Sequence, residues 1–335
     1  MNDITRYDLW LYRAKRRIKL FFYILGYSVT RNKRAWSLQY QLCHARKDPL
    51  FRITRQDSSR KPLDIRPHSN AQQNFLAEIL APLLSGQTIL ASLPPSACRQ
   101  LWWFNLESTS PFTISVRLIL QGNTEEATHV LHSYYESQQP SNAANRLGID
   151  ATSNPLHQYS PLAALMPWSD SSPAAMERNQ NLALREKNLR DGKRHWPYST
   201  FFGPVPYAFA KFQIIKLQML AESFGKKGYL RHDGPDGDIN GILIWDDESE
   251  ENTWCVRLDC GGNHRAAVLV AQGARSVPIR IFPENVVRLS EANHWPLVLS
   301  KVFTPEEARN ICRRILTASP PIAWHPPFHP VPEYR

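Results

Sequence analysis

Glycine is scarce in this chain, with 14 residues among 335, whereas proline is frequent, with 26. Long connecting segments are therefore expected rather than flexible glycine linkers. The five cysteines include no C-x-x-C pair, and their odd number fits neither a disulfide framework nor a zinc site. A secretory signal with a cleavage site is also lacking. We therefore expect a reducing, cytoplasmic location.

The N-terminal segment lacks an apolar run long enough to cross a membrane. The run Leu20–Tyr27 and its flanks amount to about ten residues, whereas a spanning helix needs about 20. Aromatic and basic residues alternate around this run. Such a helix suits the surface of an anionic membrane, so residues 1–34 predict peripheral attachment at its inner face. The alternative is a helix packed on the protein's own body with its cations in solvent.

Positive charge is missing from most of the chain. Residues 1–66 hold 16 Lys/Arg against 5 Asp/Glu, an excess of +11, which leaves −1 for residues 67–335 because the whole chain carries +10. A nucleic-acid surface spread over the fold would need basic charge beyond residue 66. We therefore do not expect nucleic acid as a partner.

The remaining composition, 42% hydrophobic and 21% charged, is typical of a globular protein with a buried core. We expect an α/β protein whose N-terminal region is mixed and rich in helices. Four segments are expected. They are a basic segment and linker (1–66), a mixed region (67–195), a C-terminal domain (196–318) and a proline-rich tail (319–335).

In the mixed region, capping residues predict a helix from Asn70 to Leu84 and another from Asn123 to Glu136. Ser172-Pro173 predicts the start of a further helix. The segment Phe112–Leu118 alternates apolar and polar residues, which indicates a strand.

The C-terminal domain carries sharper signals. Helices are predicted at 207–224, 262–272 and 304–316, and strands at 241–245, 254–258 and 277–281. Pro278 suggests that the last strand lies at a sheet edge. The acidic run 246–251 is expected to be a solvated hairpin loop rather than a metal site.

The segment from Asp259 to Arg265 contains the most informative motif, Gly261-Gly262-Asn263-His264-Arg265. Glycines let the backbone turn sharply, and the free N–H groups of a helix start favour an anion such as phosphate. Arg265 can bind phosphate with two hydrogen bonds, and His264 can donate a hydrogen bond and titrate near neutrality. The alternative is a glycine turn whose arginine pairs with a local carboxylate.

This turn resembles that of the ParB/sulfiredoxin superfamily, which carries G-x-H/R-R between a strand and a helix and then a Val-Pro strand. Here Gly262, His264 and Arg265 match, and Val277-Pro278 follows. The resemblance covers about residues 200–285. It implies that the turn, including Gly261 and Asn263, grips the phosphates of ATP or another nucleotide. The whole chain is also similar to uncharacterised bacterial proteins found beside surface-polysaccharide genes.

Two departures from that family are informative. Sulfiredoxins carry a reactive cysteine where this chain has Asn263, which cannot act as a thiolate. ParB proteins add a helix-turn-helix module, for which the sequence shows only short segments. Redox repair and site-specific DNA binding are therefore both disfavoured.

The remaining precedent in the superfamily is phosphate transfer to a small hydroxyl compound. Such a kinase needs a carboxylate to orient or deprotonate the acceptor, and often Mg²⁺. Asp238 is the first candidate for catalytic base or Mg²⁺ ligand and Asp236 the second, with His264 as a further catalytic candidate. The expected acceptor is a small metabolite or a precursor of a surface glycan. The alternatives are a non-catalytic nucleotide-binding regulator or assembly factor at the membrane, and a solvated turn whose Asp residues cap nearby N–H groups.

Overall fold

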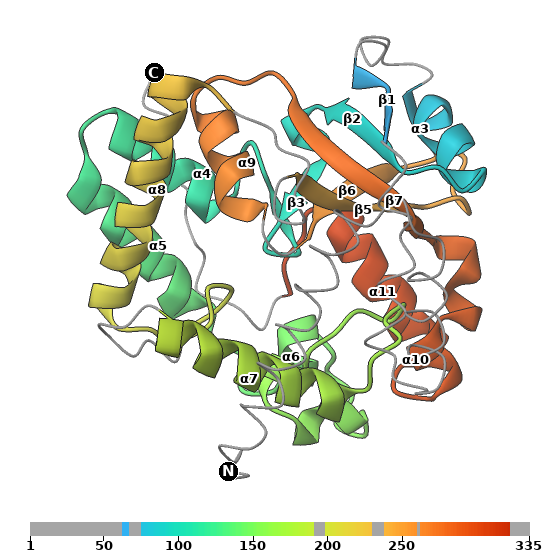
Figure 1. Ribbon diagram of the computed structural model, residues 1–335. Coiled ribbons are helices and arrows are strands. Elements are labelled where there is room, and N and C mark those ends of the chain that lie inside the picture. Colours follow the sequence, from blue (N-terminus) through green and yellow to red (C-terminus); the bar gives the residue numbers. More distant parts are fainter. Residues whose placement is uncertain (1–61, 67–74, 191–197, 230–237, 260–261, 322–335) are drawn as a thin grey trace, which may run out of the picture.

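The computed structural model describes residues 62–66, 75–190, 198–229, 238–259 and 262–321, and the side chains of 185–190 are not described. In these ranges the chain forms a mixed α/β structure built on one sheet (Figure 1). The predicted N-terminal membrane segment, Asp236 and Gly261 lie outside the described residues. None of the described helices is long and apolar enough to cross a membrane.

The sheet has the order β1-β2-β7-β5-β6-β3-β4 in the described part of the chain. Its strands are β1 (Leu63–Asp64), β2 (Ile89–Leu93), β3 (Cys98–Gln100), β4 (Phe104–Asn105), β5 (Ile239–Trp245), β6 (Trp254–Leu258) and β7 (Val277–Arg288). Strand β7 runs parallel to β5 and antiparallel to β2, while β6 is antiparallel to β5 and parallel to β3. Strands from both sides of the expected boundary at residues 195–196 therefore share one sheet.

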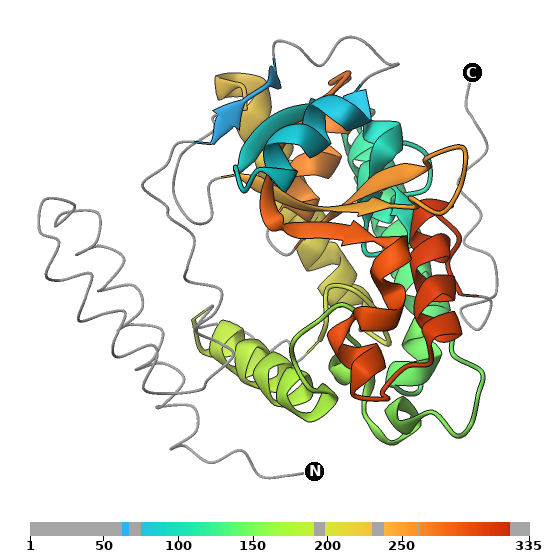
Figure 2. The same ribbon diagram turned by 90° about the vertical axis from the view of Figure 1, so that its right-hand side faces the viewer.

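Helices α3 (Phe75–Leu84) and α9 (Asn263–Ala271) contact one face of the sheet, and α11 (Pro305–Leu316) contacts the other. The other described helices are α4 (Pro111–Leu120), α5 (Thr124–Ser137), α6 (Ala143–Leu147), α7 (Pro173–Arg190), α8 (Tyr207–Lys227) and α10 (Pro296–Leu299). Short 3₁₀ turns are η3 (Pro95–Ala97), η4 (Pro155–Gln158), η5 (Pro161–Ala163) and η6 (Leu289–His294). Figure 2 shows α3 on one side of the sheet and the red helices α10 and α11 on the other.

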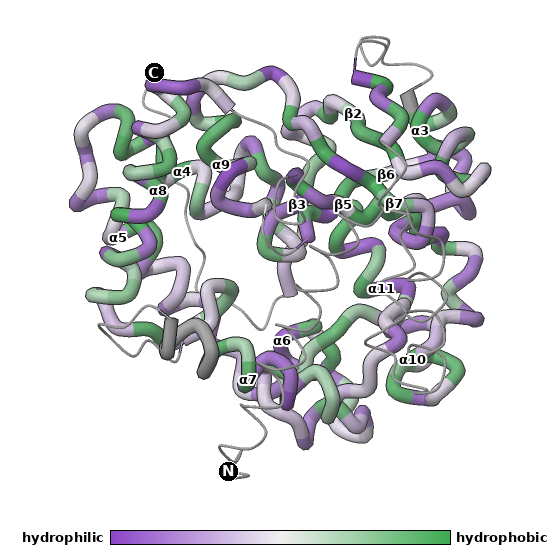
Figure 3. Tube along the Cα trace, in the orientation of Figure 1, coloured by the Kyte–Doolittle hydropathy of each residue, from purple (hydrophilic) through white to green (hydrophobic). Residues whose placement is uncertain are grey.

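The core follows from the alternation of side chains along the strands. On one face, Ile279 and its neighbours in β2, β5 and β7 pack against α3 and α9. On the other face, Ile244 of β5 and Cys255 of β6 pack against α11. A third cluster joins α4, α5, α8 and α9. Hydrophobic stretches, green in Figure 3, recur in the strands, as expected for a sheet covered on both sides.

The sequence predicted several elements correctly. Strand β6 has the expected bounds, α8 is closed by Gly228, and α11 begins with a capping box between Thr304 and Glu307. Helix α5 is present as expected, although the Asn123 side chain makes no capping hydrogen bond.

Two other predictions from the sequence are wrong. The segment Phe112–Leu118 belongs to helix α4, whose residues are buried on nearly every side. A helix buried all round loses its polar stripe, so its sequence no longer shows a period of 3.6. Strand β7 is an inner strand, although it contains Pro278. Because Pro278 is the second residue of this strand, its missing N–H removes a hydrogen bond only near the strand's end.

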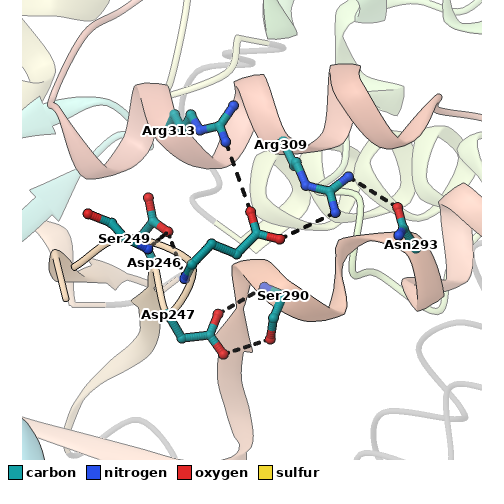
Figure 4. Close-up of polar contacts among 8 residues, drawn as sticks. Asp246, Asp247, Ser249, Ser290, Asn293, Arg309 and Arg313 are labelled. Carbon is teal, nitrogen blue, oxygen red and sulfur yellow. Dashed lines mark hydrogen bonds and ion pairs between the residues drawn. The ribbon is translucent and has the colours of Figure 1, made fainter. Parts of the chain in front are cut away.

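The acidic loop between β5 and β6 is a hairpin, as expected, but two of its carboxylates form ion pairs, and that of Asp247 is largely buried. Asp247 accepts hydrogen bonds from the backbone and hydroxyl of Ser290, and it pairs with Arg288. Glu248 pairs with Arg309 of α11, and the Arg309 guanidinium is labelled in Figure 4. The loop thus joins the sheet to η6 and α11.

Candidate functional site

The predicted phosphate-binding turn lies between β6 and α9. Gly262 precedes α9 and has φ −101° and ψ −16°, a conformation open to any residue. Its small size matters instead, because a Cβ at this position would lie 2.7 Å from Cγ2 of Ile239 in β5. Gly262 therefore allows the start of α9 to approach the start of β5 closely.

Asn263, the first residue of α9, is tied into a buried polar network. Its backbone oxygen accepts a hydrogen bond of 2.5 Å from Nε2 of Gln100 in β3. The hydroxyl of Ser110, the N-cap of α4, donates to Oε1 of Gln100. All three residues are buried. The turn is thus fixed in place by two elements from the earlier part of the chain.

His264 packs against α4. Its ring is stacked on that of Phe112, with centroids 4.6 Å apart and an angle of 25° between the planes. The imidazole is half-buried, and this stacking fixes the plane of its ring. His264 is therefore held by a specific contact at the first turn of α9.

Arg265 and Asp238 meet, although 27 residues separate them in the chain. Nη2 of Arg265 donates a hydrogen bond of 3.1 Å to the backbone oxygen of Asp238, just before β5. The Asp238 carboxylate is almost completely buried and forms an ion pair with Nη2 of Arg280 in β7. Two guanidinium groups from different elements therefore converge on the start of β5.

The third arginine is Arg66, whose charge interacts with that of Asp238. Nε and Nη2 of Arg66, after β1, donate hydrogen bonds of 2.8 and 2.5 Å to the two carboxylate oxygens of Asp64. The pKa of Arg66 is raised, mainly by this hydrogen bond, with further contributions from the negative charges of Asp64 and Asp238. The site thus combines Arg66, Arg265 and Arg280 with two carboxylates.

The structure places most of the predicted site residues together. Gly262, Asn263, His264 and Arg265 form the start of α9, and Asp238 lies beside Arg265. The described residues contain no group of three or more His, Cys, Asp or Glu that could hold a metal ion. A Mg²⁺ ion at Asp238 therefore remains a prediction that would need oxygen ligands from a bound phosphate.

The sequence did not predict four residues of the candidate site. Arg66, Gln100, Ser110 and Arg280 carry no motif, and all but Arg280 precede the turn by more than 150 positions. The pairing of β1 with β2, of β2 and β5 with β7, and of β3 with β6 brings Arg66, Arg280 and Gln100 to the site, and Ser110 joins it through its hydrogen bond to Gln100. No local pattern of residue types could have identified them.

Comparisons with protein-family models, curated proteins and solved structures gave no match for this chain.

Proposed function

We propose that this chain is a nucleotide-dependent phosphotransferase that holds its nucleotide phosphates at the start of α9. One observation carries the proposal, namely that Arg265 of α9 and Arg280 of β7 both engage Asp238 beside the first turn of that helix. Backbone N–H groups at a helix start and guanidinium groups are the usual ligands of phosphate in proteins. The resemblance of the turn to the ParB/sulfiredoxin superfamily supports the same assignment.

Asp238 is the proposed catalytic base or Mg²⁺ ligand. Its carboxylate is now held by Arg280, so an incoming phosphate would first compete for that guanidinium. If phosphate replaces the carboxylate on Arg280, Asp238 becomes available to orient an acceptor hydroxyl or to bind Mg²⁺ beside the phosphate oxygens. The acceptor would be a small metabolite or a surface-glycan precursor, as the resemblance suggests.

A second candidate is a non-catalytic nucleotide-binding regulator or assembly factor at the membrane surface. The burial of Asp238 favours it, because only 4% of this residue is exposed and an acceptor must reach its carboxylate. The DNA-binding role of ParB-like proteins has less support, since residues 67–335 carry a net charge of −1.

Thermal-shift titration tests phosphate binding. ATP, ADP, CTP and GTP, each with and without Mg²⁺, are titrated into the intact protein and its Arg265→Ala variant. We expect at least one nucleotide to raise the melting temperature of the wild type but not that of Arg265→Ala. Arg275→Ala is the matched control, since Arg275 is exposed on the loop after α9. Stabilisation of neither protein, or of both equally, would overturn the phosphate site.

Asp238→Asn separates the two candidates. For an enzyme, this variant should keep nucleotide binding and lose hydrolysis or transfer by at least about a hundredfold, the typical contribution of an acid–base group. For a regulator, the wild type itself should bind nucleotide without turnover on a broad panel of hydroxyl acceptors. Circular dichroism of the variant shows whether loss of the Arg280 pair unfolds the protein.

A further inference from the structure

The outer face of helix α8 exposes apolar side chains. Six large apolar side chains are exposed in the described part of the chain, and two of them lie one turn apart on α8. Ile215 is 46% exposed and Met219 is 65% exposed. The half-buried Phe212 extends this patch towards the start of the helix, and the ammonium group of Lys216 lies 4.2 Å from its ring centroid. Exposed apolar groups that are rimmed by polar residues are typical of a surface that binds another protein.

Charged residues lie on the same face of α8, before and after the apolar pair. Lys211 is one turn before it, and Glu222 and Lys226 are one and two turns after it; all three are exposed. Spacings of three and four residues place side chains on one side of a helix. Glu222 accepts a hydrogen bond of 3.2 Å from Gln218 of the same helix. The face is therefore positive, apolar, negative and positive in order along the helix.

This order is self-complementary in an antiparallel helix pair. With a two-fold axis beside Leu217, Ile215 faces Met219 of the partner subunit. The same axis brings Lys211 opposite Glu222 of the partner subunit. A two-fold axis repeats each contact, so two apolar contacts lie between two ion pairs. A parallel pair would instead place Lys211 beside its own copy, and like charges that meet across an interface repel.

A carboxylate outside α8 fits the same arrangement. Glu125 of α5 lies at the start of α8, where the hydroxyl of Tyr207 donates a hydrogen bond of 2.6 Å to its Oε1. Its side chain is 67% exposed. The antiparallel axis places the start of one α8 beside the end of the other, so Lys226 approaches Glu125 of the partner subunit. Because the surface carries both signs of charge, it fits a second copy better than an anionic membrane.

We propose that the outer face of α8 is the interface of a homodimer, in which two copies of this helix pack antiparallel about a two-fold axis. Ile215 and Met219 form the apolar centre, and Lys211 pairs with Glu222 of the partner subunit at the rim. Helix α8 has 21 residues and is therefore about 30 Å long, so the contact extends over several turns. The start of α9 contacts β5, β3 and α4, so the interface and the proposed nucleotide site are distinct.

Sedimentation velocity of the intact protein at a series of concentrations tests this interface. We expect the wild type to form a dimer. Met219→Glu should weaken the dimer by at least about tenfold, because it places two carboxylates in the apolar centre. Leu299→Glu is the matched control, since Leu299 is also 65% exposed but lies on α10, on the opposite side of the molecule (Figure 1). It should dimerise like the wild type, and thermal melting shows whether both variants are folded.

Charge reversal tests the antiparallel pairing. Lys211→Glu and Glu222→Lys should each weaken the dimer severalfold, since each places like charges opposite one another. The double variant restores opposite charges at both ends of the interface and should recover the dimerisation of the wild type. If the two residues acted only within their own subunit, the losses of the single variants would add in the double variant.

Three results would overturn the proposal. The first is a wild type that is monomeric at every concentration; binding to anionic vesicles that Met219→Glu abolishes would then identify a membrane as the occupant of this face. The second is a dimer that Met219→Glu leaves unchanged, because the interface then lies elsewhere. The third is loss of the dimer in Met219→Glu without recovery in the double charge variant, which rules out the antiparallel pairing.

Discussion

At the scale of single residues, a close contact rather than the backbone conformation explains why glycine stands at position 262. Glycine at the start of a phosphate-binding turn is usually explained by the approach of the ligand, and the sequence suggested that reason here. The structure adds another, since a Cβ would be 2.7 Å from Ile239 Cγ2 and 3.3 Å from its Cα. Glycine at this position therefore lets the start of α9, with Arg265, pack closely against the start of β5, which Asp238 precedes.

This contact predicts the effect of Gly262→Ala. The added methyl group must push α9 away from β5, so we expect a loss of about 1–3 kcal/mol in the free energy of unfolding, as for other overpacked sites. Gly225→Ala is the control, because nothing lies within 4 Å of a Cβ at that helical position of α8. It should stabilise the protein by up to about 1 kcal/mol. Urea denaturation measures both, and equal effects would contradict the packing argument.

Asp247 gives a prediction on pH. Burial acts to raise the pKa of Asp247, but hydrogen bonds from Ser290 and Arg288 outweigh it and hold the pKa below its ordinary value of 3.8. A depressed pKa in the folded state gives stability that is present above the unfolded pKa and lost as pH falls through the folded one. Asp247→Asn should therefore cost about 2 kcal/mol at pH 7, and the difference from wild type should shrink below about pH 4.

Chemical denaturation at a series of pH values measures this difference. Asp150→Asn is the control, because Asp150 is exposed and lies in another part of the chain, shortly before η4. Its difference from wild type should stay close to zero throughout. A difference for Asp247→Asn that is independent of pH would show that the carboxylate contributes through shape and not through charge.

At the scale of elements, helix α4 forms the support of the candidate site. Its N-cap Ser110 accepts a hydrogen bond from the backbone of Thr113 and donates one to Gln100, which in turn holds Asn263. Phe112 stacks on His264. A helix that the sequence indicated as a strand thus positions the first turn of α9.

Ser110 both caps α4 and donates a hydrogen bond to Gln100, so its contribution to stability should exceed that of a residue that only caps a helix. Ser172, before α7, also accepts a hydrogen bond from a backbone N–H, that of Ala175, but at an exposed position. Ser172→Ala should cost about 0.5–1 kcal/mol, as for an ordinary N-cap. Ser110→Ala should cost about 2 kcal/mol or more, because it also removes the hydrogen-bond donor to the buried Oε1 of Gln100. Thermal unfolding compares the two, and equal costs would contradict the network.

The same elements show what the sequence could and could not predict. Strand β6 and helices α8, α9 and α11 carry local signals, namely alternation, caps and closing glycines, and these were sufficient. The turn before α9 was also predicted, since glycine and arginine at a helix start have a local chemical meaning, and its role in binding phosphate stays a prediction. Helix α4, the inner position of β7, and the partners Gln100, Arg280 and Arg66 depend on pairing between distant segments. That information lies in the sheet and not in any window of sequence.

At the scale of the whole molecule, the sheet makes the two parts of the chain depend on each other. Inner strands β7 and β6 pair with β2 and β3, which come from the region before residue 106. A fragment that begins at residue 196 would leave both as open edges and would expose the apolar faces that α3 and α4 cover.

The domain boundaries expected from the sequence remain a prediction, and fragments test them. We expect residues 196–318 alone to show no cooperative thermal transition and to bind a hydrophobic dye, whereas residues 62–321 should melt cooperatively. Dye binding and circular dichroism on both fragments provide the readout. Cooperative melting of the shorter fragment would show that residues 196–318 form an independent domain.

The order of strands in the sheet also has a consequence for synthesis of the chain. Strands β2 and β3 leave the ribosome well before β7 and β6, which lie more than 150 residues later. During that interval their hydrogen-bonding edges are open and their apolar side chains lack cover, so the nascent chain is exposed to aggregation and to chaperones. The sheet cannot close before β7 is synthesised, and the ion pair between Asp238 and Arg280 of β7 forms only then.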